Sequence, residues 1–83
     1  MTKDEQIKAI KKEVKLFQDK ISAQIQNIID QRYETFDNRS EAWQDSEKGE
    51  FFEEQTTDLD DALMDIESLF LEIEEKLDEV INL

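Results

Sequence analysis

Apolar residues recur at alternating steps of three and four residues along two long stretches of the chain. The first stretch contains Ile7, Ile10, Val14, Phe17, Ile21 and Ile28, with Gln24 in the one polar position, and near its end the stripe drifts through Ile25, Ile29, Tyr33 and Phe36. The second contains Phe52, Leu59, Leu63, Ile66, Phe70, Ile73, Leu77 and Val80, with Thr56 in the polar position. This heptad spacing places one apolar stripe along an α-helix. Because the 83 residues include no proline and one glycine, little interrupts such helices. We predict an all-α fold.

The pattern predicts two long helices within a single domain, at about residues 3–36 and 50–81. Thr2 followed by Glu5 is typical of a capping box at the first helix start. Residues 37–49 are predicted to form a connector or a short helix, in which Asn38 and Glu41 would make a second capping box. The alternative is one long second helix that starts at Ser40 and tolerates Gly49 in its contact face.

Charge predicts that the two helices run antiparallel. Residues 1–39 carry a net charge of +1 and residues 40–83 a net charge of −14, which gives −13 for the chain. An antiparallel hairpin brings the lysines at the start of the first helix beside the carboxylates at the end of the second. Each exposed pair contributes only about 0.2–1 kcal/mol, so we expect these charges to select register more than to add stability.

The two apolar stripes match in length if each residue of the first helix faces a residue of the second whose number brings the sum to about 86. This register places the bend at Trp43. Gln31 is then predicted to face Gln55 and Thr56, and Gln24 to face Ala62. Buried amides need hydrogen-bond partners, so polar residues in the contact face should specify this register.

Residues 41–67 hold eleven carboxylates and a single lysine. Six of the carboxylates follow steps of three and four and should form one stripe along a helix: Glu47, Glu50, Glu54, Asp58, Asp61 and Asp65. A regular negative ridge is similar to one strand of a nucleic-acid backbone. One interpretation is therefore a mimic that occupies the basic surface of a nucleic-acid-binding protein. The other is a face that only keeps a small bundle in solution.

Two further groups of side chains have alternative interpretations. Trp43, Phe51 and Phe52 lie close together in the sequence near the bend, where they form either a local core or an anchor for a partner. Other apolar residues fall beside or behind the predicted contact faces, namely Leu16, Ile25, Ile29, Met64, Leu69, Leu71 and Ile81. Two hairpins that form a four-helix bundle could cover them, and so could a larger partner. We expect self-association.

The composition argues against several functions. Without histidine or cysteine, the chain lacks the commonest general base and the usual ligands of zinc. A two-helix rod offers no pocket in which carboxylates could work as acid and base. We therefore predict no enzyme activity, no metal and no cofactor. The excess of acid argues against direct binding to nucleic acid or to an anionic membrane. No apolar run approaches the ~18 residues of a membrane span, and the start of the sequence lacks the apolar region of a signal peptide, so we expect a cytoplasmic protein.

Part of the middle of the chain resembles a known group of proteins. Residues Arg39, Ser40, Glu41, Trp43, Gln44, Ser46, Glu47, Lys48, Gly49 and Glu50 follow a pattern close to R-S-E-x-W-Q-x-S-E-K-G-E. This pattern, followed by an acidic amphipathic helix, is similar to a stretch of small uncharacterised phage and mobile-element proteins. The resemblance covers residues 38–69 and carries over no functional residues. It implies a phage or prophage setting, in which small acidic proteins often inhibit host defence or host nucleic-acid enzymes.

Overall fold

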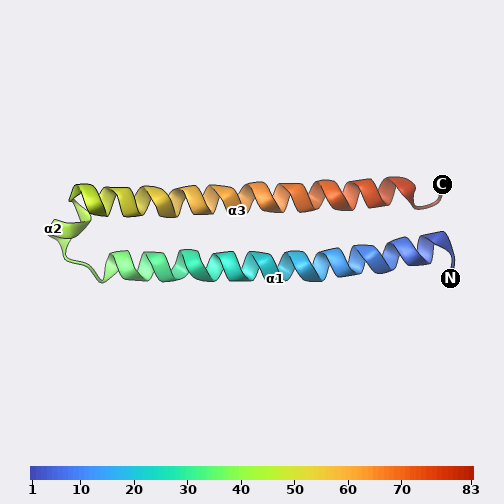
Figure 1. Cartoon of the computed structure of the whole chain (residues 1–83), viewed down its shortest axis with the longest axis horizontal. Helices are drawn as coiled ribbons and strands as arrows, with labels where there is room; N and C mark the ends of the chain where they lie inside the picture. The colour runs from blue at the N-terminus through green and yellow to red at the C-terminus, as the bar shows by residue number, and fades with distance from the viewer.

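The chain forms an antiparallel helical hairpin in a computed structural model that describes all 83 residues. Helix α1 spans Lys3–Asp37, the single-turn helix α2 spans Glu41–Gln44, and helix α3 spans Glu47–Val80. The two long helices lie side by side, α2 forms the bend, and both termini lie at the opposite end (Figure 1). The molecule is a rod 62 Å long. The predicted all-α hairpin is confirmed.

Hydroxyl side chains begin all three helices. The Oγ1 atom of Thr2 accepts a hydrogen bond from the backbone N–H of Glu5 (3.2 Å), at the predicted start of α1. Ser40 caps α2 in the same way, and the Oγ of Ser46 accepts from the N–H of Gly49 (3.2 Å) at the start of α3. The predicted capping box at Asn38 is wrong, because Asn38 is instead the residue that ends α1.

The bend contains a short helix, α2, as the first of the two alternatives for residues 37–49 expected, and the alternative of one long second helix from Ser40 is wrong. Because Ser46 caps α3, that helix begins at Glu47, three residues before the predicted start, and it is not continuous with α2. The Nε2 atom of Gln44 donates hydrogen bonds to the carbonyl oxygens of Phe36 (2.9 Å) and Arg39 (3.2 Å). These bonds hold α2 against the end of α1.

The face of α1 that contacts α3 is rotated from the predicted stripe. Ile7, Val14 and Ile21 are half-buried as predicted, but Ile10, Phe17 and Ile28 are exposed. The remaining contact positions belong to residues that include Lys11, Gln18, Ile25, Ile29, Arg32 and Phe36. α1 carries two neighbouring apolar stripes, and one contact with α3 can bury only one of them. Ile25, Ile29 and Phe36, through which the stripe was expected to drift, are therefore part of the contact, whereas Tyr33 is exposed.

The contact face of α3 follows the prediction along most of its length. Leu63 and Phe70 are buried, and residues Phe52, Leu59, Ile66 and Leu77 are half-buried. Ile73 and Val80 were expected in this face but are exposed, and Glu74 and Ile81 take those positions. Ile81 was expected outside the contact and is half-buried within it.

Contacts between the long helices give the register. Phe17 meets Phe70 edge to face with ring centroids 6.1 Å apart, and Lys11 pairs with Asp78. Lys11–Asp78 is the one ion pair between α1 and α3, so the two opposite charge clusters lie side by side with little direct pairing. The facing residue numbers sum to about 88, close to the expected 86.

The polar residue that specifies the register is Arg32 and not Gln31. The Nε of Arg32 donates to the Oγ1 of Thr56 (2.8 Å), and its Nη2 donates to the carbonyl oxygen of Phe52 (3.2 Å). Thr56 is 1% exposed, whereas Gln31 and Gln24 are exposed and outside the contact face. A guanidinium can reach across the helix pair and supply several donors at once, which a glutamine amide cannot match.

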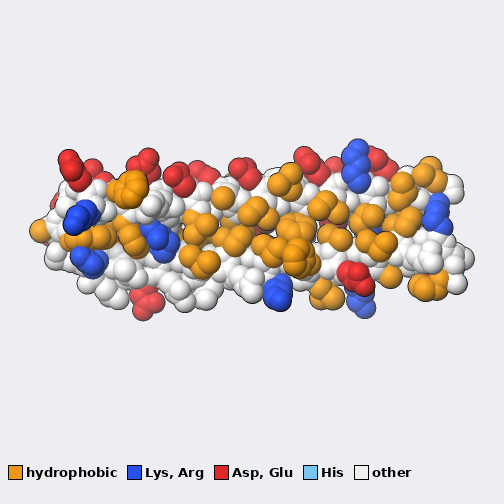
Figure 2. All heavy atoms as spheres, in the orientation of Figure 1, with side chains coloured by type: hydrophobic (Ala, Val, Ile, Leu, Met, Phe, Trp, Pro, Cys, Tyr) orange, Lys and Arg blue, Asp and Glu red, His pale blue; other side chains and the backbone are white.

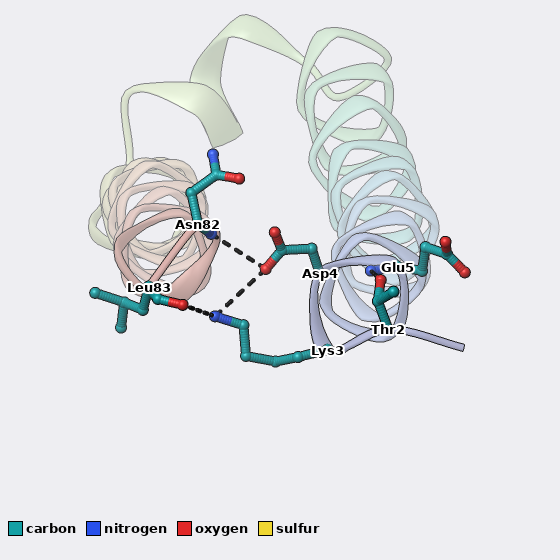
Figure 3. A network of polar contacts seen from close by, with 6 residues as sticks. All are labelled: Thr2, Lys3, Asp4, Glu5, Asn82 and Leu83. Carbon is teal, nitrogen blue, oxygen red and sulfur yellow. Dashed lines mark hydrogen bonds and ion pairs between the residues drawn. The ribbon is translucent and has the colours of Figure 1, made fainter.

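The open end of the hairpin is closed by a small polar network (Figure 3). The backbone N–H of Asn82 donates to Oδ1 of Asp4 (3.1 Å), and Nζ of Lys3 donates to the carbonyl oxygen of Leu83 (3.0 Å). Asn82 has a φ of 67°, a left-handed conformation that asparagine tolerates better than most residues. The network ties the end of the chain to the first turn of α1.

Candidate protein-binding surfaces

The six carboxylates of the acidic stripe lie on the outer edge of α3, facing away from α1. Glu54 and Asp58 are each two residues from the buried Thr56, and two residues is more than half a helical turn. All six side chains are exposed: Glu47, Glu50, Glu54, Asp58, Asp61 and Asp65. Figure 2 shows acidic side chains in a row along the upper edge of the rod, which is the α3 edge in Figure 1. The structure therefore brings the six together as one line.

No basic side chain neutralises the acidic stripe. The four ion pairs of the structure, Lys3–Asp4, Lys11–Asp78, Lys15–Asp19 and Lys76–Glu79, all lie outside it. Arg32, the basic residue of the adjoining part of α1, directs its donors to Thr56, Phe52 and Gln55 instead of a carboxylate. Unpaired like charges at steps of three and four repel one another. The stripe therefore presents a concentrated negative potential to the solvent.

The two aromatic candidates have different surroundings. Trp43 is half-buried, and its ring meets Phe36 at 6.0 Å and Phe52 at 5.7 Å between centroids. The guanidinium of Arg39 covers the Trp43 ring at 4.2 Å. Trp43 is thus part of the local core at the bend. Phe51 is 60% exposed and takes no part in that cluster, so it remains a candidate anchor.

A second surface was not identified as one surface from the sequence. It consists of the exposed residues Ile10, Phe17 and Ile28 of α1 with Leu69, Ile73 and Val80 of α3, here called the apolar face. Each of these follows a contact-face residue by three positions, as Phe17 follows Val14 and Ile73 follows Phe70. Three positions along an α-helix fall about 60° short of a full turn. In two antiparallel helices this offset from the contact face points to the same side of the hairpin. Figure 2 shows the resulting band of hydrophobic side chains along the rod.

The structure has one open groove and no cluster of side chains that could hold a metal ion. A shallow open groove on α3 is lined by Leu69, Glu72, Ile73, Lys76 and Leu77, and it lies at the edge of the apolar face. No cluster of three or more carboxylates is arranged to hold a metal ion. None of the helices has an apolar stretch long enough to cross a bilayer.

Comparisons with protein-family models, with curated proteins and with solved structures found no match to this chain.

Proposed function

We propose that the protein is a non-enzymatic interaction module whose acidic stripe occupies the basic, nucleic-acid-binding surface of another protein. The observation that carries the proposal is the line of six exposed carboxylates on the outer edge of α3, none of which is paired with a lysine or arginine. A partner with a basic groove would supply the missing counter-charges.

The dimensions of the stripe support mimicry of a nucleic-acid strand. From Glu47 to Asp65 the helix rises about 27 Å, so the six charges follow one another at about 5 Å. A nucleic-acid strand carries one charge every ~3.4 Å of helix axis. The stripe is thus sparser than a phosphate backbone, with steps of about 4.5 and 6 Å, and α3 carries it along one edge. The resemblance of residues 38–69 to small phage proteins fits an inhibitor of a host defence or nucleic-acid enzyme.

A second candidate function is a structural or adaptor coiled coil whose carboxylates only keep it in solution. The apolar face favours this candidate, because it offers a packing surface that has no need of the acidic stripe. The two functions differ in what the stripe does: only the inhibitor needs its charges for binding.

The test is capture of partners from a bacterial lysate by the wild-type protein and two charge-matched variants. The stripe variant carries Glu54→Lys, Asp58→Lys and Asp61→Lys. The control variant carries Glu53→Lys, Asp60→Lys and Glu67→Lys, which changes the charge equally but on a different side of α3. The chain's net charge rises by the same amount in both, so a difference between them reports position and not charge alone.

We expect wild type and the control variant to capture the same nucleic-acid-binding protein and the stripe variant to lose it, with helix content unchanged by circular dichroism. The captured protein should elute as salt is raised, because exposed charge pairs are screened. Equal capture by both variants would show that the stripe is not the recognition surface. Loss of folding in the stripe variant would show that its acids serve structure, which supports the adaptor.

A further inference from the structure

We propose that the apolar face packs against the same face of a second copy of this chain, with the two bends at opposite ends. The product is an antiparallel four-helix bundle. This inference is independent of the proposed function, because the apolar face and the acidic stripe contain different residues on different sides of α3.

One hairpin alone leaves more surface exposed than a compact protein of its mass. A compact folded monomer of 9.9 kDa exposes about 5,200 Å² by surface scaling. This chain exposes 6336 Å², an excess on the order of 1,100 Å². A typical stable protein interface removes about 800 Å² from each partner. The excess is therefore the size that one dimer interface would bury.

Six of the exposed apolar side chains share one side of the hairpin, whereas Leu16, Tyr33, Phe51, Met64 and Leu71 are exposed elsewhere. Ile10, Phe17 and Ile28 lie on one side of α1 at spacings of 7 and 11 residues, close to whole numbers of turns. Leu69, Ile73 and Val80 lie on the same side of the hairpin, at spacings of 4 and 7. A hairpin that supplies a continuous apolar band on one side is half of a four-helix bundle.

Carboxylates are distributed so that few of them lie on the apolar face (Figure 2). The chain carries 23 carboxylates, yet Figure 2 shows few of them within the hydrophobic band, and the row of acids follows the outer edge of α3. A second copy can therefore approach this face without bringing the two acidic stripes together. A basic partner would find few carboxylates to pair with here, so the face suits a copy of itself better than the partner of the acidic stripe.

Charge also selects the relative direction of the two hairpins. Most of the unpaired carboxylates, including those of the acidic stripe from Glu47 to Asp61, lie in the half of the rod near the bend. Bends at the same end would put two such halves in contact, whereas bends at opposite ends separate them. The opposite arrangement also lays the lysine-rich start of α1 beside the acidic half of the partner.

The test begins with the mass of the wild-type chain in solution, measured by sedimentation equilibrium over a range of concentrations. We expect twice the chain mass of 9.9 kDa, and a melting temperature that rises with protein concentration. A single-chain mass with a concentration-independent melting temperature overturns the proposal, and so does an assembly larger than two chains. These measurements need no variant, so they decide even where a variant fails to fold.

A matched pair of variants identifies the face. Leu69 is 57% exposed on the apolar face, and Leu71 is 55% exposed on the other side of the hairpin. We expect Leu69→Glu to weaken dimerisation at least 100-fold, while Leu71→Glu leaves the dimer mass unchanged. Both variants replace a leucine of nearly the same exposure by glutamate, so they differ only in the side of the hairpin that is changed. Dissociation by Leu71→Glu and not by Leu69→Glu overturns the assignment.

The direction of packing can be measured because the chain has no native cysteine. A nitroxide on Lys48→Cys, an exposed position near the bend, reports the separation of the two bends. With bends at opposite ends, pulsed electron paramagnetic resonance should give about 50 Å between labels, from a rise of 1.5 Å per residue. A separation below about 20 Å would place the bends together and contradict the antiparallel arrangement.

Discussion

At the scale of single residues, Gly49 is the position where the bend tolerates no side chain. A Cβ atom added there would lie 2.2 Å from the carbonyl oxygen of Trp43 and 2.5 Å from that of Gln44. Both are backbone atoms, so α2 would have to move away from α3. Gly49 lies in the first turn of α3 and is needed for this close approach, not for a special φ angle.

We predict that Gly49→Ala destabilises the protein by about 1–3 kcal/mol, as overpacking does. The sign is informative, because glycine to alanine within a helix otherwise stabilises by about 1 kcal/mol. Urea denaturation followed by circular dichroism measures the change, with the neighbouring exposed Lys48→Ala as the control, expected to change stability by less than ~0.5 kcal/mol. A Gly49→Ala variant as stable as wild type would mean that α2 does not pack on α3 as described.

Asp4 gives the open end of the hairpin a pH dependence. The N–H of Asn82 donates a hydrogen bond to its carboxylate, and this bond, with help from Lys3, lowers the pKa of Asp4 below its ordinary 3.8. A lowered pKa in the folded state means that the contact stabilises the closed end above about pH 3.8. The stabilisation is lost as the pH falls through the lowered value.

We predict that amide hydrogen exchange at Asn82 is slower in wild type than in Asp4→Asn at neutral pH. The difference should disappear as the pH falls below the Asp4 pKa, which a carboxyl NMR titration measures directly. Asp19→Asn, remote from this end, serves as the control and should leave Asn82 protected. An Asp4 carboxyl that titrates at or above 3.8 would contradict the network.

At the scale of elements, Arg32 and Thr56 hold α1 and α3 in register. The Arg32 side chain donates to Thr56, Phe52 and Gln55, and its guanidinium lies 3.9 Å from the centre of the Phe52 ring. Lysine has a point charge and cannot reproduce this planar fork or its stacking. Removing the threonine hydroxyl instead would leave the Arg32 Nε without its partner.

We predict that Arg32→Lys and Thr56→Val each cost about 1–2 kcal/mol of unfolding free energy, as lost hydrogen bonds to a charged group do. In a double-mutant cycle the two losses should not add, because they remove the same bond. Thermal or urea unfolding of the four proteins provides the cycle. Additive losses would show that Arg32 and Thr56 do not interact.

The sequence predicted the helices and their pairing because heptad spacing and charge are local, additive properties. It could not choose between the two apolar stripes of α1, since Ile10, Phe17 and Ile28 are as apolar as Ile25, Ile29 and Phe36. The choice depends on contacts across the pair, such as the reach of Arg32 to Thr56. The start of α3 was predicted three residues too late, although Ser46, whose hydroxyl caps the helix, was a signal that could have located it.

Of the candidate site, the acidic stripe was predictable from the sequence, and the different surroundings of Trp43 and Phe51 were not. The acidic stripe could be located because its spacing differs in phase from the contact face of α3, and the structure places all six residues on one exposed edge. The sequence could not show which of Trp43 and Phe51 is buried, because their burial depends on how α2 packs against α1 and α3. That packing puts Trp43 among Phe36 and Phe52 and leaves Phe51 outside.

At the scale of the whole molecule, the hairpin separates its surfaces by chemistry. One edge carries unpaired carboxylates and one side carries the apolar band (Figure 2), and only five residues are buried between the helices and at the bend. In the dimer that we propose, each chain keeps its acidic stripe on an outer edge. Self-association and binding of a basic partner would then occur together, and each dimer would present two stripes.

We propose that the acidic stripe takes the place of nucleic acid on the partner protein. The most direct measurement is displacement of a fluorescent DNA duplex from the captured nucleic-acid-binding protein, followed by anisotropy. We predict that wild type and the Glu53, Asp60 and Glu67 control variant displace the duplex, less effectively as salt is raised, and that the Glu54, Asp58 and Asp61 variant does not. Equal displacement by the two variants, or wild-type binding that leaves the duplex in place, would contradict the claim.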